Sequence, residues 1–455
     1  DFCLSRGLGD VYKRQSKDTI AAVATAPGIG GVGIIRISGE KLLPLAQHLS
    51  QKANVHARYA YLSSFYDRNK EIIDQGLMLF FPAPHSFTGE DVIELHIHGG
   101  PIVLNRLLRE VLHQGARLAL PGEFTQRAFL NNKIDLVQAE SIADLIEAPS
   151  EEAAKMASRS LQGAFSTKIT ALQEGLTHLR MLSEAHLDFP EEELDSSSEA
   201  HYLDLIGKLI EENENLLNNA QNGVRLKEGA RVVLLGPPNV GKSSLLNYLS
   251  GKESAIVTDI AGTTRDVIHE EIILQGLPLH ILDTAGLRKN ADTIESIGIE
   301  RSKKAMQEAD IALIMQEAGS SSMEPELVTL LANAPPSLKA IYVYNKSDLY
   351  PKSEKEEGLF ISIKEGTGLE KLKESILKAA GFTGAGESLF SARHRHVSRL
   401  QKTLDQLKSA QQVIHESELF AEQLRLAQVF LSEITGEFTS NDLLGEIFSH
   451  FCIGK

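Results

Sequence analysis

The sequence predicts a multidomain chain of the α/β and α classes. An α+β N-terminal domain is expected to precede a helical bundle that is interrupted by an inserted α/β domain. Three observations predict this fold: a phosphate-loop pattern between an apolar strand and a helix-forming run, strand-like alternation within residues 17–132, and helical patterns on both sides of the phosphate loop. A chain of 455 residues is long enough for about two to four domains.

The first predicted domain spans residues 17–132 and mixes strands with helices. Residues 19–24 and 33–37 are strand-like apolar runs separated by a glycine-rich turn, and residues 91–98 alternate as a half-buried strand does. A helix is predicted after the Gly-Gly-Pro break that follows this strand. Residues 1–16 have neither periodicity nor an initiating methionine, so we expect a non-native or mis-translated, disordered leader.

The helical domain is predicted in two parts, residues 133–225 and 384–455, which flank a nucleotide-binding domain at residues 226–383. Apolar residues spaced three or four apart mark one helix face in the first part: Leu161, Phe165, Ile169, Leu172, Leu176 and Leu179. Each part has too one-sided a pattern to stand alone. We therefore expect the two parts to pack together, with the α/β domain as an insertion between them.

The composition indicates where in the cell the protein acts and which kinds of partner it can bind. Hydrophobic residues make up 42% of the chain, yet no apolar run approaches the roughly 20 residues of a membrane span. The net charge of −15 argues against a general nucleic-acid-binding protein, although it leaves room for a local basic patch. Because the only cysteines are Cys3 and Cys452 and no secretory signal is seen, we expect a cytoplasmic location without membrane attachment.

The phosphate-loop pattern is the strongest functional signal. Gly236, Gly241, Lys242 and Ser243 occupy the defining positions of Gly-x-x-x-x-Gly-Lys-Ser, directly after the apolar run 232–235. In such a loop, backbone N–H groups surround phosphate oxygens, the lysine reaches the β and γ phosphates, and the serine hydroxyl binds Mg²⁺. A chance match is the alternative, and the strand–loop–helix context and the later motifs disfavour it.

Two later segments, each after an apolar strand, predict a guanine base. Asp348, in Asn345-Lys346-Ser347-Asp348, can accept two hydrogen bonds from the guanine edge that adenine cannot donate. Residues 362–364 fit the loop that lies behind the base. Since these segments follow the phosphate loop in the order expected of a GTPase, GTP is the predicted nucleotide.

A further segment, Asp283-Thr284-Ala285-Gly286, can hold Mg²⁺ through water and offer an N–H group to the γ phosphate. In Ras-like proteins a glutamine follows it and orients the attacking water, but this chain has Leu287. Either hydrolysis is slow and the protein acts as a switch, or another group replaces the glutamine. Glu295 is a candidate for that group, and an ordinary surface glutamate is the alternative.

The first switch is expected around Thr263 and Thr264, where one hydroxyl can reach Mg²⁺. The predicted GTP-binding positions come from the phosphate loop, the two switches and the base-binding segments. They are Asn239, Val240, Gly241, Lys242, Ser243, Ser244, Thr258, Asp259, Ile260, Ala261, Gly262, Thr263, Thr264, Asp283, Thr284, Ala285, Gly286, Asn345, Lys346, Asp348, Ser362, Ile363 and Lys364.

Over residues 17–455 the chain resembles the tRNA modification GTPase family MnmE, also called TrmE. The motifs that carry the resemblance are Ala261-Gly262-Thr263-Thr264-Arg265-Asp266, Asp283-Thr284-Ala285-Gly286-Leu287-Arg288, Pro121-Gly122-Glu123-Phe124, Arg127-Ala128-Phe129-Leu130-Asn131 and Phe451-Cys452-Ile453-Gly454-Lys455. The terminal Cys-Ile-Gly-Lys is far more specific than the motifs that many GTPases share. The resemblance implies a folate-binding, dimerising N-terminal domain and a Ras-like P-loop GTPase domain inserted in the helical domain.

The resemblance also implies how hydrolysis proceeds without the glutamine or an arginine finger. K⁺ would bind beside the phosphates through Asn239, Thr258, Ile260 and Thr263, and Mg²⁺ through Ser243 and Thr264. Glu295 matches the water-orienting glutamate of the family, and Lys242 and Glu295 are the catalytic candidates in this domain. Two such domains would meet across their switches within a homodimer.

A folate site is implied for the N-terminal domain. Arg36, Glu94, Lys133 and Lys455 match folate-contacting positions, and the ligand would be a 5-formyl- or methylene-tetrahydrofolate. A glutamate can bind the amino-pyrimidine edge of a pterin, and basic side chains suit folate carboxylates. Cys452 is a candidate catalytic residue because the family places its motif near this site. A small buried hydrophobe is the equal alternative for Cys452.

We interpret the chain as a K⁺-stimulated GTPase that acts on tRNA with an FAD-dependent partner of the MnmG (GidA) family. The pair would add a carboxymethylaminomethyl or aminomethyl group to C5 of the wobble uridine, and GTP hydrolysis would drive domain motion that gates this reaction. Two alternatives stay open. One is a regulatory or ribosome-assembly GTPase switch, and the other is a stand-alone folate-dependent one-carbon transferase.

Overall fold

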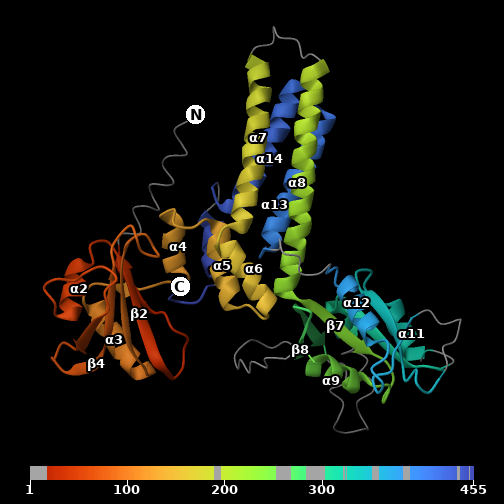
Figure 1. Cartoon of the computed structure of the whole chain (residues 1–455), viewed down its shortest axis with the longest axis horizontal. Helices are drawn as coiled ribbons and strands as arrows, with labels where there is room; N and C mark the ends of the chain where they lie inside the picture. The colour runs from red at the N-terminus through yellow and green to blue at the C-terminus, as the bar shows by residue number, and fades with distance from the viewer. Residues whose placement is uncertain are drawn as a thin grey trace. The chain divides into compact units, whose positions relative to one another are not determined.

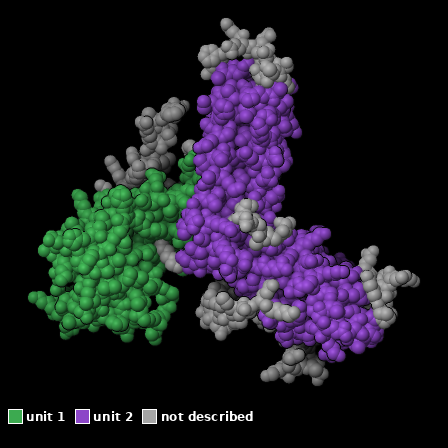
Figure 2. All heavy atoms as spheres, in the orientation of Figure 1, with its two compact units in different colours: residues 1–143, 432–455 green, residues 144–431 purple. Residues whose placement is uncertain are grey.

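The computed structural model describes residues 18–188, 196–252, 268–282, 303–320, 323, 325–350, 358–382, 390–437, 441–449 and 451–454. The chain divides into two compact units, which Figure 2 distinguishes by colour. Unit 1 comprises residues 1–143 and 432–455, and unit 2 comprises residues 144–431. The C-terminal segment therefore groups with the N-terminal domain. The predicted leader lies outside the described residues.

Unit 1 is built on a six-stranded sheet with the order β3-β4-β5-β2-β1-β6. The strands are β1 (Ile20–Val23), β2 (Gly30–Gly39), β3 (Tyr61–Tyr66), β4 (Ile72–Phe81), β5 (Asp91–Gly99) and β6 (Arg117–Leu118). Neighbouring strands are antiparallel, except that β1 and β6 are parallel. The strands predicted near residues 19–24, 33–37 and 91–98 are confirmed, whereas β3 and β4 were not predicted.

The two faces of this sheet differ because β5 alternates. Ile93, Leu95 and Ile97 lie in the buried core, which α2 (Leu43–Ser50) and α3 (Pro101–His113) complete. Glu94 and His96 are only partly buried and lie on the opposite face. On that second face Phe124 packs against Ile20 and Ala22 of β1, so the partly buried polar side chains lie beside an apolar cluster.

The C-terminal end of the chain is fitted onto unit 1. The helix α15 (Asn441–Ser449) packs through Leu444 and Phe448 against Leu136 and Ala139 of α5 (Leu136–Ile146). Beyond α15, Ile453 forms a β-bridge with Pro121, directly before α4 (Glu123–Leu130). Gly454 has a φ of 95°, and a Cβ atom there would collide with the carbonyl oxygen of Val23.

Unit 2 contains a helical bundle formed from both sides of the insertion. Its helices are α6 (Glu151–Leu161), α7 (Ala164–Asp188), α8 (Ser196–Glu228), α13 (His394–Gln412) and α14 (Ser417–Thr435). The long helices α7, α8, α13 and α14 run lengthwise beside one another (Figure 1). Phe165 stacks on Phe390 with ring centroids 4.1 Å apart, and the amide of Asn213 donates to the carbonyl of Leu400 at 2.9 Å. The predicted packing of the two helical parts is thus confirmed.

The predicted apolar stripe is the core-facing side of α7. Phe165, Ile169, Leu172, Leu176 and Leu179 are all buried. Leu161 instead ends α6 and is half-buried. Across the described parts of the chain, no helix is long and apolar enough to cross a membrane.

The second domain of unit 2 is a six-stranded sheet with the order β12-β11-β10-β7-β9-β8. Its strands are β7 (Ala230–Leu235), β8 (Ile268–Leu274), β9 (Leu277–Leu282), β10 (Ile311–Glu317), β11 (Lys339–Asn345) and β12 (Leu359–Phe360). All pairings are parallel except that of the edge strand β8 with β9. Apolar side chains of α9 (Lys242–Lys252) and α12 (Leu369–Ala379) cover one face, and those of α11 (Pro325–Ala332) cover the other, so the predicted doubly wound fold is confirmed.

Candidate functional site

The loop between β7 and α9 has the backbone that a phosphate loop requires. Gly236, Asn239 and Gly241 have φ values of 139°, 61° and 107°, in the left-handed region. A Cβ atom at Gly236 would collide with the carbonyl oxygen of Met315, and one at Gly241 would collide with the side-chain amide of Asn345. The loop therefore passes too close to its neighbours for any other residue at these two positions.

The first turn of α9 can receive an anion. This helix begins at Lys242, and Ser243 and Ser244 are exposed. The ammonium of Lys242 donates to the carbonyl oxygens of Gly236 at 2.6 Å and Pro237 at 2.8 Å, so it is folded back over the loop. N–H groups at a helix N-terminus and a nearby ammonium together attract phosphate oxygens.

One buried side chain ties three predicted segments together. Asn345 is 5% exposed, and its amide nitrogen donates to the carbonyl of Val240 in the phosphate loop at 2.8 Å. Its amide oxygen accepts from the backbone N–H of Ile363 at 3.4 Å. The phosphate loop, the Asn345–Asp348 segment and the 362–364 loop are therefore held together by one side chain.

The carboxylate of Asp348 is prepared to accept hydrogen bonds from a base. The Ser362 hydroxyl donates to Asp348 Oδ1 at 2.7 Å, and this bond is the main reason that the pKa of Asp348 lies below its ordinary value. The positive charge of Lys364 acts in the same direction. The exposed carboxylate is thus ionised, with acceptor positions directed to solvent.

The described metal-ligand candidates fit hard cations. The hydroxyl of Ser243 and the side-chain oxygen of Asn239 are oxygen donors of the kind that Mg²⁺ and K⁺ bind. Within the described ranges, no group of three or more His, Cys, Asp or Glu side chains could hold a metal ion. The other predicted donors belong to the switches.

Several predicted residues lie outside the described residues. They are the first-switch positions, the second-switch positions, the candidate water-orienting glutamate and the terminal lysine: Thr258, Asp259, Ile260, Ala261, Gly262, Thr263, Thr264, Asp283, Thr284, Ala285, Gly286, Glu295 and Lys455. Their roles stay predictions.

A second polar site lies on the other face of the unit 1 sheet, beside the cluster that Phe124 forms with Ile20 and Ala22. Arg36 of β2 and Glu94 of β5 are register partners, and Arg36 Nε lies 2.9 Å from Glu94 Oε1. The Arg36 guanidinium is 5.7 Å from the ring centre of Phe87 and 5.9 Å from that of Phe124. His96 Nε2 lies 3.3 Å from the other carboxylate oxygen of Glu94. The sequence analysis did not single out these rings or His96, although alternation in β5 places His96 on the same face as Glu94.

The remaining folate candidates have mixed outcomes. Lys133 donates from Nζ to the carbonyl of Pro84 at 3.0 Å. Cys452 is a free, exposed thiol, so the alternative of a small buried hydrophobe is wrong. Its carbonyl accepts from the N–H of Gly122 at 3.4 Å, one residue before α4, the helix that carries Phe124. The C-terminal motif and Arg36 thus approach the same helix.

The phosphate loop and the ionised carboxylate beyond β11 define a P-loop protein that binds guanine nucleotides. The family profile described as the MnmE helical domain matches residues 136–452, and the profile of the GTP-binding protein TrmE N-terminus matches residues 19–133. The chain therefore belongs to the MnmE family of tRNA modification GTPases.

Several relatives match this chain over nearly its full length. The tRNA modification GTPase MnmE of Neisseria meningitidis serogroup C is 54% identical over 444 residues, which cover 96% of this chain and 99% of that protein. The same-named protein of Chromobacterium violaceum is 50% identical over 443 residues, which cover 96% and 98%. That of Laribacter hongkongensis is 52% identical over 448 residues, which cover 96% and 99%.

The substitution Asp348→Asn tests base recognition. An asparagine has one acceptor and one donor where the carboxylate has two acceptors, so it matches xanthine and leaves a guanine donor unpaired. We expect GDP affinity to fall about 100-fold and xanthosine diphosphate affinity to rise, as measured by titration calorimetry. Ser362→Ala, which removes only the supporting hydroxyl, should weaken GDP binding far less. Unchanged GDP binding by Asp348→Asn would contradict this assignment.

Proposed function

We propose that this protein is a K⁺-stimulated GTPase that modifies tRNA together with an FAD-dependent protein of the MnmG (GidA) family. The pair would add a carboxymethylaminomethyl or aminomethyl group to C5 of the wobble uridine in the cytoplasm. The observation that carries the proposal is the Asn345 side chain, which joins the phosphate loop to the 362–364 loop in a chain of the MnmE family. Ser362 of that loop in turn holds the Asp348 carboxylate.

The nucleotide steps follow from the positions of the chain's own groups. Asp348 would hold the guanine edge, and the loop N–H groups and Lys242 would hold the phosphates. Since Leu287 cannot orient water, Glu295 would take that role. When bound, Mg²⁺ and K⁺ supply positive charge beside the β and γ phosphates, and Ser243 and Asn239 would be among their ligands.

The folate derivative would bind on this second face of the unit 1 sheet, beside Arg36 and Glu94. Glu94 presents a carboxylate to the amino-pyrimidine edge of a pterin, and Arg36 and Lys133 suit folate carboxylates. The proposal is supported by the ring of Phe87, which lies beside Arg36, is 38% exposed and offers a face on which a flat ring can stack. The exposed thiol of Cys452 lies beyond Gly122 in the same unit.

A homodimer formed through unit 1 is supported by apolar side chains on the edge of its sheet. Leu62 of β3 and Leu77 of β4 are register partners, and they are 64% and 40% exposed. Ile72, near the start of β4, is 61% exposed. Exposed apolar side chains that gather on the outer strands of a sheet are typical of an interface between subunits.

Dependence on the monovalent cation tests the proposed catalysis. We expect GTP turnover to be at least about tenfold faster in KCl than in NaCl at equal ionic strength. The reason is that K⁺ would supply the positive charge that an arginine finger supplies in other GTPases. The substitution Asn239→Ala should remove this difference while GDP binding persists. Equal rates in the two salts for the unsubstituted protein would contradict the role of Asn239.

Mass spectrometry of tRNA nucleosides tests the biological role. Cells that lack this protein should lose C5-modified wobble uridine, and a plasmid that encodes the unsubstituted chain should restore it. Lys242→Ala should not restore it, because phosphate binding is required. Fully modified uridine in cells without the protein would favour a regulatory switch, and full restoration by Lys242→Ala would favour a stand-alone folate-dependent transferase.

A further inference from the structure

Glu317 lies at a fixed position beside the base-binding segment. It is the last residue of β10, and its register partner Asn345 is the last residue of β11. The N–H of Ala318 donates to the carbonyl of Asn345 at 2.8 Å, which continues the pairing beyond both strands. Because Asn345 is itself tied to the phosphate loop, the backbone at Glu317 is placed rigidly relative to the nucleotide site.

The side chain of Glu317 holds Lys346. Lys346 Nζ lies 2.6 Å from Glu317 Oε1, and Lys346 has a left-handed backbone with a φ of 64°. The side chain of Glu317 is 43% exposed and that of Lys346 is 35% exposed, so the ion pair contributes little to the stability of the fold. Any role of this ion pair in nucleotide binding therefore depends on its position beside the base-binding segment.

Lys346 lies between the residue that grips the phosphate loop and the carboxylate that faces the base. A lysine carries a flexible apolar stem and a charged end, and the stem can cover the face of a flat ring. An unrestrained lysine would lose its rotamer freedom when a nucleotide bound, and this loss would weaken affinity. A lysine that is already held by a carboxylate loses much less.

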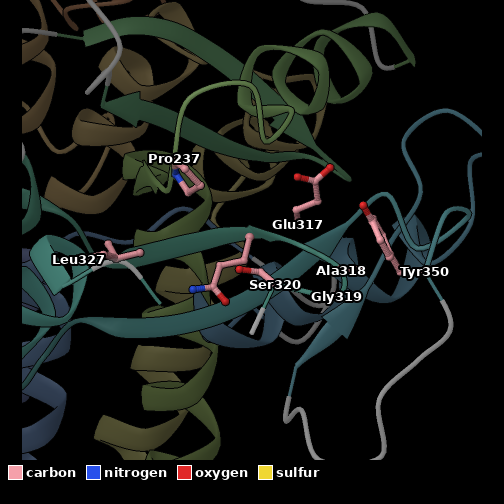
Figure 3. A pocket seen from close by; sticks show the side chains of 8 residues that line it. Pro237, Glu317, Ala318, Gly319, Ser320, Leu327 and Tyr350 are labelled. Atoms are coloured by element: carbon pink, nitrogen blue, oxygen red, sulfur yellow. The ribbon is translucent and has the colours of Figure 1, made fainter. Parts of the chain in front are cut away.

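Glu317 also lines a cavity of about 220 Å³ together with Pro237 of the phosphate loop and Tyr350. Figure 3 shows the Glu317 carboxylate and the Tyr350 hydroxyl at the same end of this cavity. The ring of Tyr350 packs against Gly319, where a Cβ atom would collide with it. Because the Glu317 side chain is 43% exposed and lines an existing cavity, its truncation leaves no new buried void, so such a variant should still fold.

We propose that Glu317 is a positioning residue for guanine-nucleotide binding. It holds Lys346 in place before the nucleotide arrives and so sets the affinity for GTP and GDP, but not the rate at which bound GTP is hydrolysed. The inference rests on the proposal that Asn345–Asp348 binds the guanine base.

The test compares Glu317→Ala and Glu317→Gln with the unsubstituted full-length chain. Equilibrium titration with a fluorescent GDP analogue should give a dissociation constant about 3- to 10-fold higher for Glu317→Ala. Glu317→Gln, which keeps an acceptor but not the charge, should lie between the two. Single-turnover hydrolysis at saturating GTP should be unchanged in both variants.

Glu308→Ala is the matched control. Glu308 is similarly exposed and lies 3.9 Å from Lys304. It precedes Ile311, the start of β10, whereas Glu317 ends that strand, so its loss should leave the dissociation constant unchanged. In a Lys346→Met background, Glu317→Ala should have no further effect, because the group that it positions is gone.

Three outcomes would overturn the inference: an unchanged dissociation constant for Glu317→Ala, an equal loss in the Lys346→Met background, or a slowed hydrolysis of saturating GTP. Asp348→Asn, measured in parallel, separates this inference from the proposed function. Normal GDP binding by Asp348→Asn would mean that the base site itself is wrongly assigned. Weak GDP binding by Asp348→Asn with normal binding by Glu317→Ala would overturn only the role of Glu317.

Discussion

The nucleotide site depends on one buried hydrogen bond, from the Asn345 amide to the carbonyl of Val240. The two residues are 105 positions apart in the sequence, and they meet because β10 lies between β7 and β11 in a parallel sheet. Parallel strands deliver their following loops to the same edge, where α/β proteins bind ligands. The contact is so close that Gly241 has no room for a Cβ atom. Phosphate binding and base recognition are therefore built as a single arrangement.

The insertion is fastened to the helical bundle at both of its junctions. The buried carboxylate of Asp144 accepts from Lys227 near the end of α8, at 2.6 Å, and from Arg393 just before α13, at 2.9 Å. The guanidinium of Arg225 donates to the carbonyl of Gly381, just beyond α12. Both connections therefore converge near one carboxylate, and breaking a buried ion pair is costly. Movement of the nucleotide loops that shifts either connection would act on the same contacts.

Local sequence patterns predicted many of the strands, helices and loops. Most of the features that they did not predict depend on contacts between residues far apart in the sequence. The phosphate loop is a short motif that follows an apolar run, and the later predicted strands are apolar runs themselves, so both could be predicted from the sequence. The pairing of Arg36 with Glu94 requires knowing that β2 lies beside β5, and the exposure of Cys452 depends on where α15 packs. Glu317 is a single glutamate at a strand end, without any motif around it. The roles that the family resemblance implied for Glu295 and the first switch stay predictions.

The most direct measurement is GDP binding by the Gly241→Ala variant. The added methyl group would force Asn345 away from the phosphate loop, at a position whose φ of 107° an alanine disfavours. Gly251, in α9, has open space around its Cβ position, so Gly251→Ala is a matched control that should bind GDP normally. The account predicts that Gly241→Ala loses GDP affinity by about 100-fold or more while it retains the circular dichroism spectrum of the unsubstituted protein. Normal GDP binding by Gly241→Ala would contradict the account.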